Sequence, residues 1–162
     1  MPAAFLPGSF DPFHNGHLAI VRVAAGLFDT VIVGVGYNPA KPSGMFTVEE
    51  RQKMIMESTA DLANVQVTSF DGLVTVAAKS HGADVLVKGI RTATDLDAEM
   101  VQANTNEATG GIQTMFVPGL GAAALVASRY LREIGIREGD ISSLVPQAVW
   151  DAMQRKTGAL GQ

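Results

Sequence analysis

The sequence predicts an α/β fold of the Rossmann-like type, in which a doubly wound, five-stranded parallel sheet carries helices on both faces. Short apolar runs, several of them rich in β-branched residues, alternate five times with segments of helical character. The connections are short, and no linker, internal repeat or low-complexity segment interrupts the alternation. Successive strand–helix units of this kind build parallel sheets that are covered on both sides.

Each strand is expected where a short apolar run is bounded by turn residues. The expected strands cover 3–6, 30–36, 65–70, 85–87 and 113–117. Helices are expected at 17–28, 47–60, 73–81, 93–107, 122–134 and 146–155. Thr47 and Glu50 form a capping-box pattern at the start of the second helix, and Pro146 suits the first position of the last one.

Composition limits the classes of function. The 162 residues suit a single domain, 1–162, whose tail from about 157 to 162 is expected to fray. There is no cysteine, and His14 and His17 have zinc-like spacing without a third ligand, so no metal site is expected. A net charge of −4 without a basic stripe argues against nucleic-acid binding. Without a signal segment or an apolar run of about 18 residues, a cytoplasmic protein that does not cross a membrane is expected.

The segment 7–17 carries the strongest functional signal. It joins the first strand to the first helix and contains Gly8 and Gly16, which allow the backbone to approach a ligand closely. The start of a helix offers N–H groups and the positive end of the helix dipole, so it favours anions such as phosphate. His17 lies in the first helical turn, where its ring can donate a hydrogen bond to a phosphoryl oxygen.

A second group of charged residues follows the fourth strand. In sheets of this type the ligand lies beyond the carboxyl ends of the strands, where the strand order reverses. With the common order 3-2-1-4-5, that point brings the segment 7–17 together with Lys88 and Arg91. Arginine binds phosphate through two hydrogen bonds, and lysine acts as a point charge. Asp95 and Glu99 follow on one helix face, and an exposed salt-bridge ladder explains them equally well.

The segment 8–17 resembles the signature of the HxGH nucleotidyltransferases, with Gly-Ser-Phe-Asp-Pro at 8–12 and His-x-Gly-His at 14–17. That superfamily moves a nucleotidyl group from a nucleoside triphosphate to a phosphate acceptor. Such a transfer needs positioning and charge stabilisation rather than a covalent intermediate. A phosphate monoester acceptor needs no strong base, because it is a dianion near neutral pH. The side chains expected to neutralise the two reacting anions are His17, Lys41, Lys88 and Arg91.

Nearly the whole chain is similar to the bacterial phosphopantetheine adenylyltransferases. Besides the first motif, the matching segments are Asn-Pro-x-Lys at 38–41, Met-Phe at 45–46, Glu-Glu-Arg at 49–51 and Lys-Gly-Ile-Arg at 88–91. The resemblance implies catalytic roles for Ser9, His17, Lys41 and Arg91. It implies ATP contacts from Ser9, Phe10, His17, Gly89, Ile90, Arg91, Glu99 and Ser128. It implies contacts with the acceptor from Ser9, Lys41, Val74 and Lys88.

The chain departs from the family at several places, among them aromatic residues of the family that are missing within 121–124 and 97–99. A serine-rich stretch that the family carries near its end reads Ala127-Ser128-Arg129 here, so that Ser128 alone remains and Arg129 is a candidate to replace a hydroxyl contact by charge. His14 stands where the family usually has threonine.

The resemblance implies transfer of AMP from ATP to 4′-phosphopantetheine, which gives dephospho-coenzyme A and pyrophosphate in coenzyme A biosynthesis. It also implies Mg²⁺ bound mainly through the ATP phosphates, a hexameric homo-oligomer and feedback binding of coenzyme A. Two alternatives stay open. One is an HxGH nucleotidyltransferase with another phosphate acceptor, such as nicotinate mononucleotide, and the other is a nucleotide-binding relative without turnover.

Overall fold

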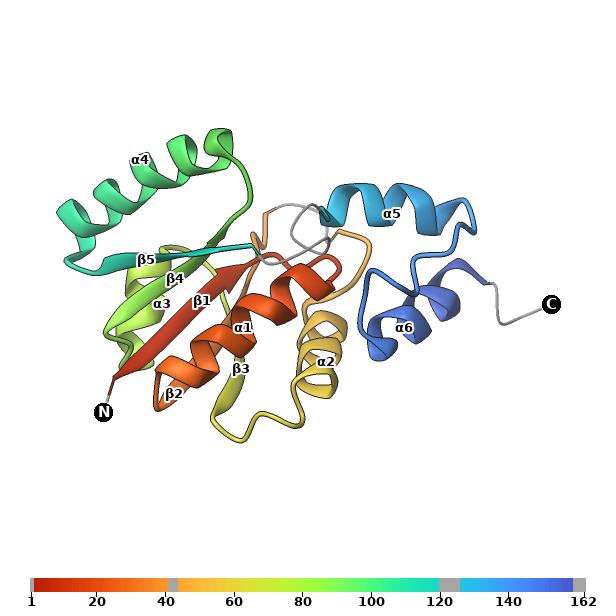
Figure 1. The fold of residues 1–162 in the computed structure, drawn as a ribbon, viewed down its shortest axis with the longest axis horizontal. Coiled ribbons are helices and arrows are strands. Elements are labelled where there is room, and N and C mark those ends of the chain that lie inside the picture. The colour runs from red at the N-terminus through yellow and green to blue at the C-terminus, as the bar shows by residue number, and fades with distance from the viewer. Residues whose placement is uncertain (1, 41–43, 120–125, 159–162) are drawn as a thin grey trace.

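The computed structural model describes residues 2–40, 44–119 and 126–158. Its strands form one parallel sheet in the order β3-β2-β1-β4-β5 (Figure 1). The strands are β1 (Ala3–Gly8), β2 (Thr30–Gly36), β3 (Val65–Phe70), β4 (Val85–Ile90) and β5 (Gln113–Pro118). The predicted fold class and strand order are therefore confirmed.

Helices link the strands and complete the carboxyl-terminal part of the chain. They are α1 (Asn15–Leu27), α2 (Val48–Ser58), α3 (Val74–Ser80), α4 (Ala93–Gly110), α5 (Ser128–Ile136) and α6 (Gln147–Thr157). Thr47 caps α2 through the predicted capping box with Glu50. Of the tail that was expected to fray, Thr157 ends α6 and Gly158 is its C-cap, whereas 159–162 lie outside the described residues.

The predicted start of the fifth helix is wrong. Helix α5 begins at Ser128. Of the residues expected to precede it in the helix, Val126 is not helical and Ala127 is an extended N-cap. The remaining expected positions, 122–125, lie outside the described residues. Alanine favours helices, but tertiary contacts override so weak a preference. The carbonyl of Val126 accepts a hydrogen bond from Arg91 at 3.2 Å, and the Ser128 hydroxyl donates to the carbonyl of Pro12 at 2.8 Å.

The sheet separates two hydrophobic cores. On one face, Leu6 and Val33 belong to the larger core, which includes residues of α1, α2 and α6. On the other face, Phe5 and Ile32 pack with α3, which lies behind the sheet in Figure 1. Helix α4 contacts α3 and the β4–β5 edge of the sheet. Both faces are thus covered, as the short apolar strands predicted.

Strands β1 and β4 separate at the point where the strand order reverses. Strand β1 pairs with β2 along its whole length, from Ala3 to Gly8. It pairs with β4 only through Ala4 with Val85 and Phe5 with Leu86. Beyond these pairs, the carboxyl-terminal halves of β1 and β4 share no ladder. A crevice opens there, between the segment that leaves β1 and the segment that leaves β4.

Candidate active site

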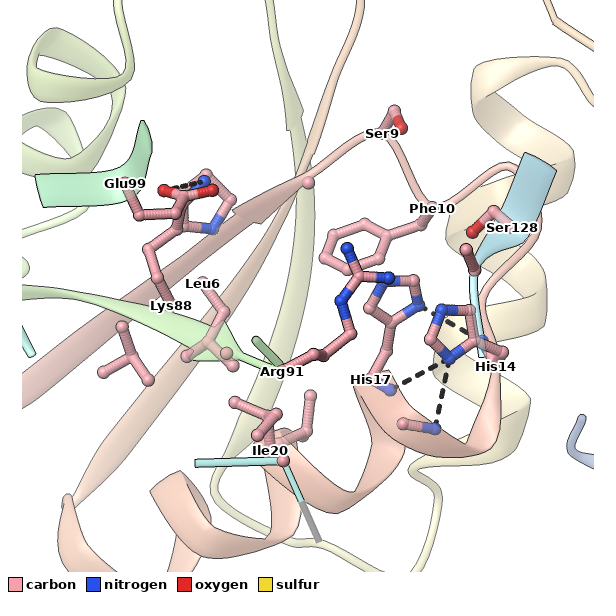
Figure 2. A pocket seen from close by; sticks show the side chains of 18 residues that line it. Leu6, Ser9, Phe10, His14, His17, Ile20, Lys88, Arg91, Glu99 and Ser128 are labelled. Carbon is pink, nitrogen blue, oxygen red and sulfur yellow. Dashed lines mark hydrogen bonds and ion pairs between the residues drawn. The ribbon is translucent and has the colours of Figure 1, made fainter. Parts of the chain in front are cut away.

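Two cavities lie at the carboxyl end of the sheet. The first, of about 360 Å³, lies between the start of α1 and the end of β4 (Figure 2). Sequence-predicted residues in its wall are Ser9, Phe10, His17, Lys88, Gly89, Arg91, Glu99 and Ser128. The second cavity, of about 410 Å³, lies between α3, α4 and the sheet. The two share Pro7, Gly8, Lys88 and Glu99, so they meet at these residues.

A capping box made of two histidines holds the start of α1. His14 is the N-cap, and its Nδ1 accepts from the backbone N–H of Gly16 at 3.1 Å and of His17 at 3.4 Å. In return, the backbone N–H of His14 donates to Nδ1 of His17 at 3.3 Å. A ring nitrogen that accepts carries no proton, so each neutral imidazole has its proton on Nε2. The fold thereby sets the tautomer of both rings.

Aromatic neighbours hold the His17 ring in place. It stacks on the His14 ring, with centroids 3.6 Å apart and planes 23° apart. Phe13 stacks on it at 5.6 Å, and Phe10 meets it edge-on at 5.0 Å. Figure 2 shows the ring at the cavity wall in the region of the Arg91 side chain. With Nδ1 occupied by the cap, Nε2–H is the ring's remaining hydrogen-bond donor.

Burial makes both histidines neutral at physiological pH. Burial and the positive charge of Arg91 lower the pKa of His14 to about 4. Burial lowers the pKa of His17 well below 6.5, and His14 and Arg91 lower it further. The expectation that His17 adds positive charge to the site is therefore corrected for this state of the protein. His17 offers a neutral donor, and lysine and arginine side chains carry the positive charge.

Arg91 is fixed at the edge of the first cavity. Its Nε donates to Asp95 Oδ2 at 2.9 Å and its Nη2 to Asp95 Oδ1 at 3.4 Å. Its Nη1 donates to the carbonyl of Val126 at 3.2 Å, which ties the end of β4 to the segment before α5. Contacts within the described residues thus use three of the five guanidinium N–H groups, and the other two can serve a phosphate. The Arg91–Asp95 part of the anticipated salt-bridge ladder is present.

Lys88 and Glu99 form an ion pair where the two cavities meet. Lys88 Nζ lies 3.1 Å from Glu99 Oε2, and about a quarter of each side chain is exposed. Figure 2 shows this pair on one side of the cavity and His14, His17 and Ser128 on the other. A phosphate that binds at the junction would compete with the Glu99 carboxylate for the lysine.

The second cavity has a mixed apolar and polar wall. Val74 contributes from the start of α3, and Gln102 and Asn106 contribute from α4. Val74 and Lys88 both line this cavity, and the acceptor contacts that the resemblance implied for them remain predictions. Ser9, which was expected beside them, is an exposed residue in the wall of the first cavity and does not line the second.

One other expected residue takes a different place. Ile90 lines neither cavity, and its carbonyl instead accepts from Gly119 N–H at 2.8 Å. Lys41 lies outside the described residues. The expected roles of Ser9, Gly89 and Phe10 remain predictions, although all three lie in the wall of the first cavity.

The retained Ser128 and the altered Arg129 at the start of α5 behave differently from each other. Ser128 lines the first cavity, but its hydroxyl donates to the carbonyl of Pro12. Arg129 lines neither cavity: its side chain is 73% exposed and pairs with Glu133 along the helix at 3.5 Å. The structure gives no support to the idea that Arg129 replaces a missing phosphate contact.

Sequence reasoning missed a buried charged cluster behind the site. The carboxylate of Asp11 accepts from the backbone N–H groups of Met45 and Phe46, each at 2.9 Å. Arg51 Nε lies 3.7 Å from Asp11 Oδ1, and Arg132 Nη1 lies 3.7 Å from Asp11 Oδ2. Asp11 and Arg51 lie within matched motifs, which was the available signal, but their partners are distant in sequence. The cluster joins the segment after β1 to the segment before α2 and to α5.

Comparison with known proteins identifies the family of this chain. Residues 5–137 match the family model described as cytidylyltransferase-like. A phosphopantetheine adenylyltransferase from Rhizobium rhizogenes is 42% identical over 96% of this chain and 96% of its own length. The chain belongs to the phosphopantetheine adenylyltransferase family. Another relative of that name, from Corynebacterium diphtheriae, is 42% identical over 96% of this chain and 98% of its own.

A solved structure shares the architecture of this family member. It comes from Vibrio parahaemolyticus and is assigned as a nicotinate-nucleotide adenylyltransferase. It superposes with a TM-score of 0.66 and 20% identity, over 94% of this chain and 99% of that one. At that identity the likeness concerns the fold alone.

Proposed function

We propose that this family member transfers AMP from ATP to 4′-phosphopantetheine, giving dephospho-coenzyme A and pyrophosphate in coenzyme A biosynthesis. The observation that carries the proposal is full-length similarity of about 41% to relatives named for this activity. The geometry supports it independently, because two cavities meet at one cation, Lys88. One cavity suits a nucleotide and the other suits the arm of an acceptor.

The first cavity has the features of a triphosphate site. It is lined by the starts of two helices, through Gly16 and His17 of α1 and Ser128 of α5. Helix starts attract phosphate through their dipoles and free N–H groups. At α1 the N–H groups of Gly16 and His17 already donate to His14, so this helix contributes its dipole. Arg91 adds a fixed positive charge at the same wall. We therefore place ATP in this cavity, with its α-phosphate near His17.

The second cavity suits the pantetheine arm, with the acceptor phosphate at Lys88. Its wall combines apolar side chains such as Val74 with the amides of Gln102 and Asn106. An arm that contains amide groups and short apolar stretches needs both kinds of contact. The Lys88 ammonium would exchange Glu99 for the phosphate, which places the acceptor oxygen at the junction of the cavities.

The transfer step requires little covalent help. An acceptor phosphate oxygen forms a bond to the α-phosphorus, and the bond from that phosphorus to the bridging β-oxygen breaks, so pyrophosphate leaves with the electron pair. The acceptor is already a dianion near neutral pH, so no general base is needed. Nε2–H of His17 donates to a non-bridging α-oxygen, where negative charge develops. Arg91 and Lys88 reduce the repulsion between the two anions.

We propose that Mg²⁺ enters with the nucleotide as a complex with its phosphates. Within the described ranges, no group of three or more histidine, aspartate or glutamate side chains is arranged to hold a metal ion. Glu99, a carboxylate in the cavity wall, is paired with Lys88. No step above depends on a magnesium ion that the protein alone would hold.

The homo-oligomer, with a hexamer as the expected state, and binding of coenzyme A as a feedback ligand complete the proposal. Exposed apolar side chains around α3, α4 and β5 support self-association: Leu73, Val76, Met100, Val101 and Met115. Light scattering that finds a monomer at micromolar concentration would contradict the proposed oligomer.

A cytoplasmic location stays a prediction. Among the described helices, none is both long and apolar enough to span a membrane.

A pyrophosphate-release assay with several acceptors tests the proposed reaction. We expect release with ATP and 4′-phosphopantetheine and little release with pantetheine, which lacks the phosphate that Lys88 would hold. Release with nicotinate mononucleotide instead would identify a different acceptor. ATP binding without release with any acceptor would identify a relative that has lost turnover.

A further inference from the structure

We propose that Ser128 and Arg132 act together as a positioning pair that holds the start of α5 over the nucleotide cavity, rather than as phosphate ligands. The inference rests on the proposed function for the identity of the nucleotide. It differs from the role that family resemblance implies for Ser128, which is direct contact with ATP.

The Ser128 hydroxyl is already committed to another partner. It donates to the carbonyl of Pro12 at 2.8 Å, between residues 116 positions apart in the sequence. A hydroxyl has a single hydrogen to donate, and phosphate oxygens at neutral pH chiefly accept. In this arrangement the side chain therefore cannot also donate to the triphosphate. At this end of α5, a phosphate contact would therefore come from main-chain N–H groups.

Arg132, one turn further along α5, binds Asp11, the residue that precedes Pro12. Its Nη1 donates to the carbonyl of Asp11 and lies 3.7 Å from the Asp11 carboxylate. The two side chains thus bind consecutive carbonyls, of Asp11 and Pro12, in the segment that leads to His14 and His17. Because both contacts leave one helix and end on one short segment, they fix the distance between the starts of α5 and α1.

That distance matters because the effect of a helix start on an anion is short-ranged. The favourable field of N–H groups and dipole falls off within the first turn. Displacement of a phosphate-binding element by about 1 Å can cost about a hundredfold in rate. Leu131 and Gly135 are the buried residues of α5, and Gly135 lies against Met153 of α6. At the start of the helix, the contacts of Ser128 and Arg132 add to the hydrogen bond from Arg91 to the carbonyl of Val126.

A double-mutant cycle on ATP binding tests the pair. Calorimetry would measure the Kd of ATP, without acceptor, for wild type, Ser128→Ala, Arg132→Met and the double variant. Each single change is expected to raise Kd about five- to tenfold, the scale of one lost hydrogen bond. The double change should raise the Kd of ATP no more than either single change, because each single change already releases the start of α5 from the 11–12 segment. Kd for 4′-phosphopantetheine should stay within twofold, and Ser128→Thr and Arg132→Lys should restore ATP binding.

Arg129→Met is the matched control, because it removes an exposed arginine from the same helix and should leave the Kd of ATP unchanged. Effects that multiply in the double variant would mean that Ser128 binds phosphate independently, and would overturn the inference. Silent single variants, or equal losses for both ligands, would also overturn it. Wild-type protein that binds ATP but forms no dephospho-coenzyme A would refute the proposed function while leaving this cycle measurable.

Discussion

At the scale of single residues, the site depends on a histidine that is kept neutral. The cap occupies Nδ1 of His17, and burial with the nearby Arg91 charge lowers its pKa well below 6.5. A neutral ring with its proton on Nε2 is a donor whose direction the stacked His14 and Phe13 rings fix. A preorganised donor of this kind stabilises a transition state without reorganisation during the reaction.

Replacement of His17 by alanine should therefore reduce kcat rather than binding. We expect kcat to fall by two orders of magnitude or more, since one lost transition-state donor is worth about 3 kcal/mol. Steady-state kinetics with both substrates would measure the loss, and circular dichroism would check that the fold is retained. A folded variant with near-normal kcat would refute the role given to His17.

Replacement of Lys88 by alanine should affect the acceptor more than the nucleotide. Loss of a charge-assisted contact to phosphate is worth about 1.5–3 kcal/mol, so KM for 4′-phosphopantetheine should rise about ten- to a hundredfold. KM for ATP should change less. Lys53→Ala, which removes an exposed lysine of α2, is the control. An equal rise in both KM values would show that Lys88 does not belong to the acceptor side.

At the scale of elements, the cap of α1 should make the protein sensitive to acid. The pKa of His14 is about 4 in the folded state and 6.5 as a model value, so the unfolded chain binds the proton more tightly. Stability is therefore full above pH 6.5 and is lost as the pH falls towards 4. His14 alone should account for a loss of about 2 kcal/mol between pH 7.5 and pH 5.

Urea unfolding of wild type and His14→Asn at these two pH values measures that contribution. Asparagine is a good N-cap and does not titrate, so the variant should lose about 2 kcal/mol less stability than wild type on acidification. Parallel losses in the two proteins would show that folding does not lower the pKa of His14.

The segment before α2 should be intolerant of a side chain at Gly44. A Cβ added there would lie 1.9 Å from Asp11 Oδ2, inside the buried cluster that anchors this segment. We expect Gly44→Ala to lower the free energy of unfolding by about 1–3 kcal/mol, as overpacking does. Gly26→Ala is the control, because nothing lies within 4 Å of a Cβ there and alanine favours the helix. Thermal unfolding of both variants tests the contrast, and equal Tm values would contradict it.

At the scale of the whole molecule, topology explains why so much of the site could be predicted. Once the strand order is 3-2-1-4-5, the segments that follow β1 and β4 must meet at the reversal, and this places His17 near Arg91. The residues missed were those whose role depends on side-chain partners. Nothing in the local sequence indicates that Ser128 donates to Pro12 or that Arg132 donates to Asp11, 121 positions away. The neutral state of His17 likewise depends on burial, which appears only once the chain is folded.

In the proposed reaction, the α-phosphate of ATP moves with its nucleoside to the acceptor phosphate. The most direct measurement uses ATP labelled in the α-phosphate, and in a parallel reaction ATP labelled in the γ-phosphate, each with 4′-phosphopantetheine. The α-label should appear in dephospho-coenzyme A and the γ-label in pyrophosphate. An acceptor that gains the γ-label, or an α-label that stays with the nucleotide, would refute adenylyl transfer.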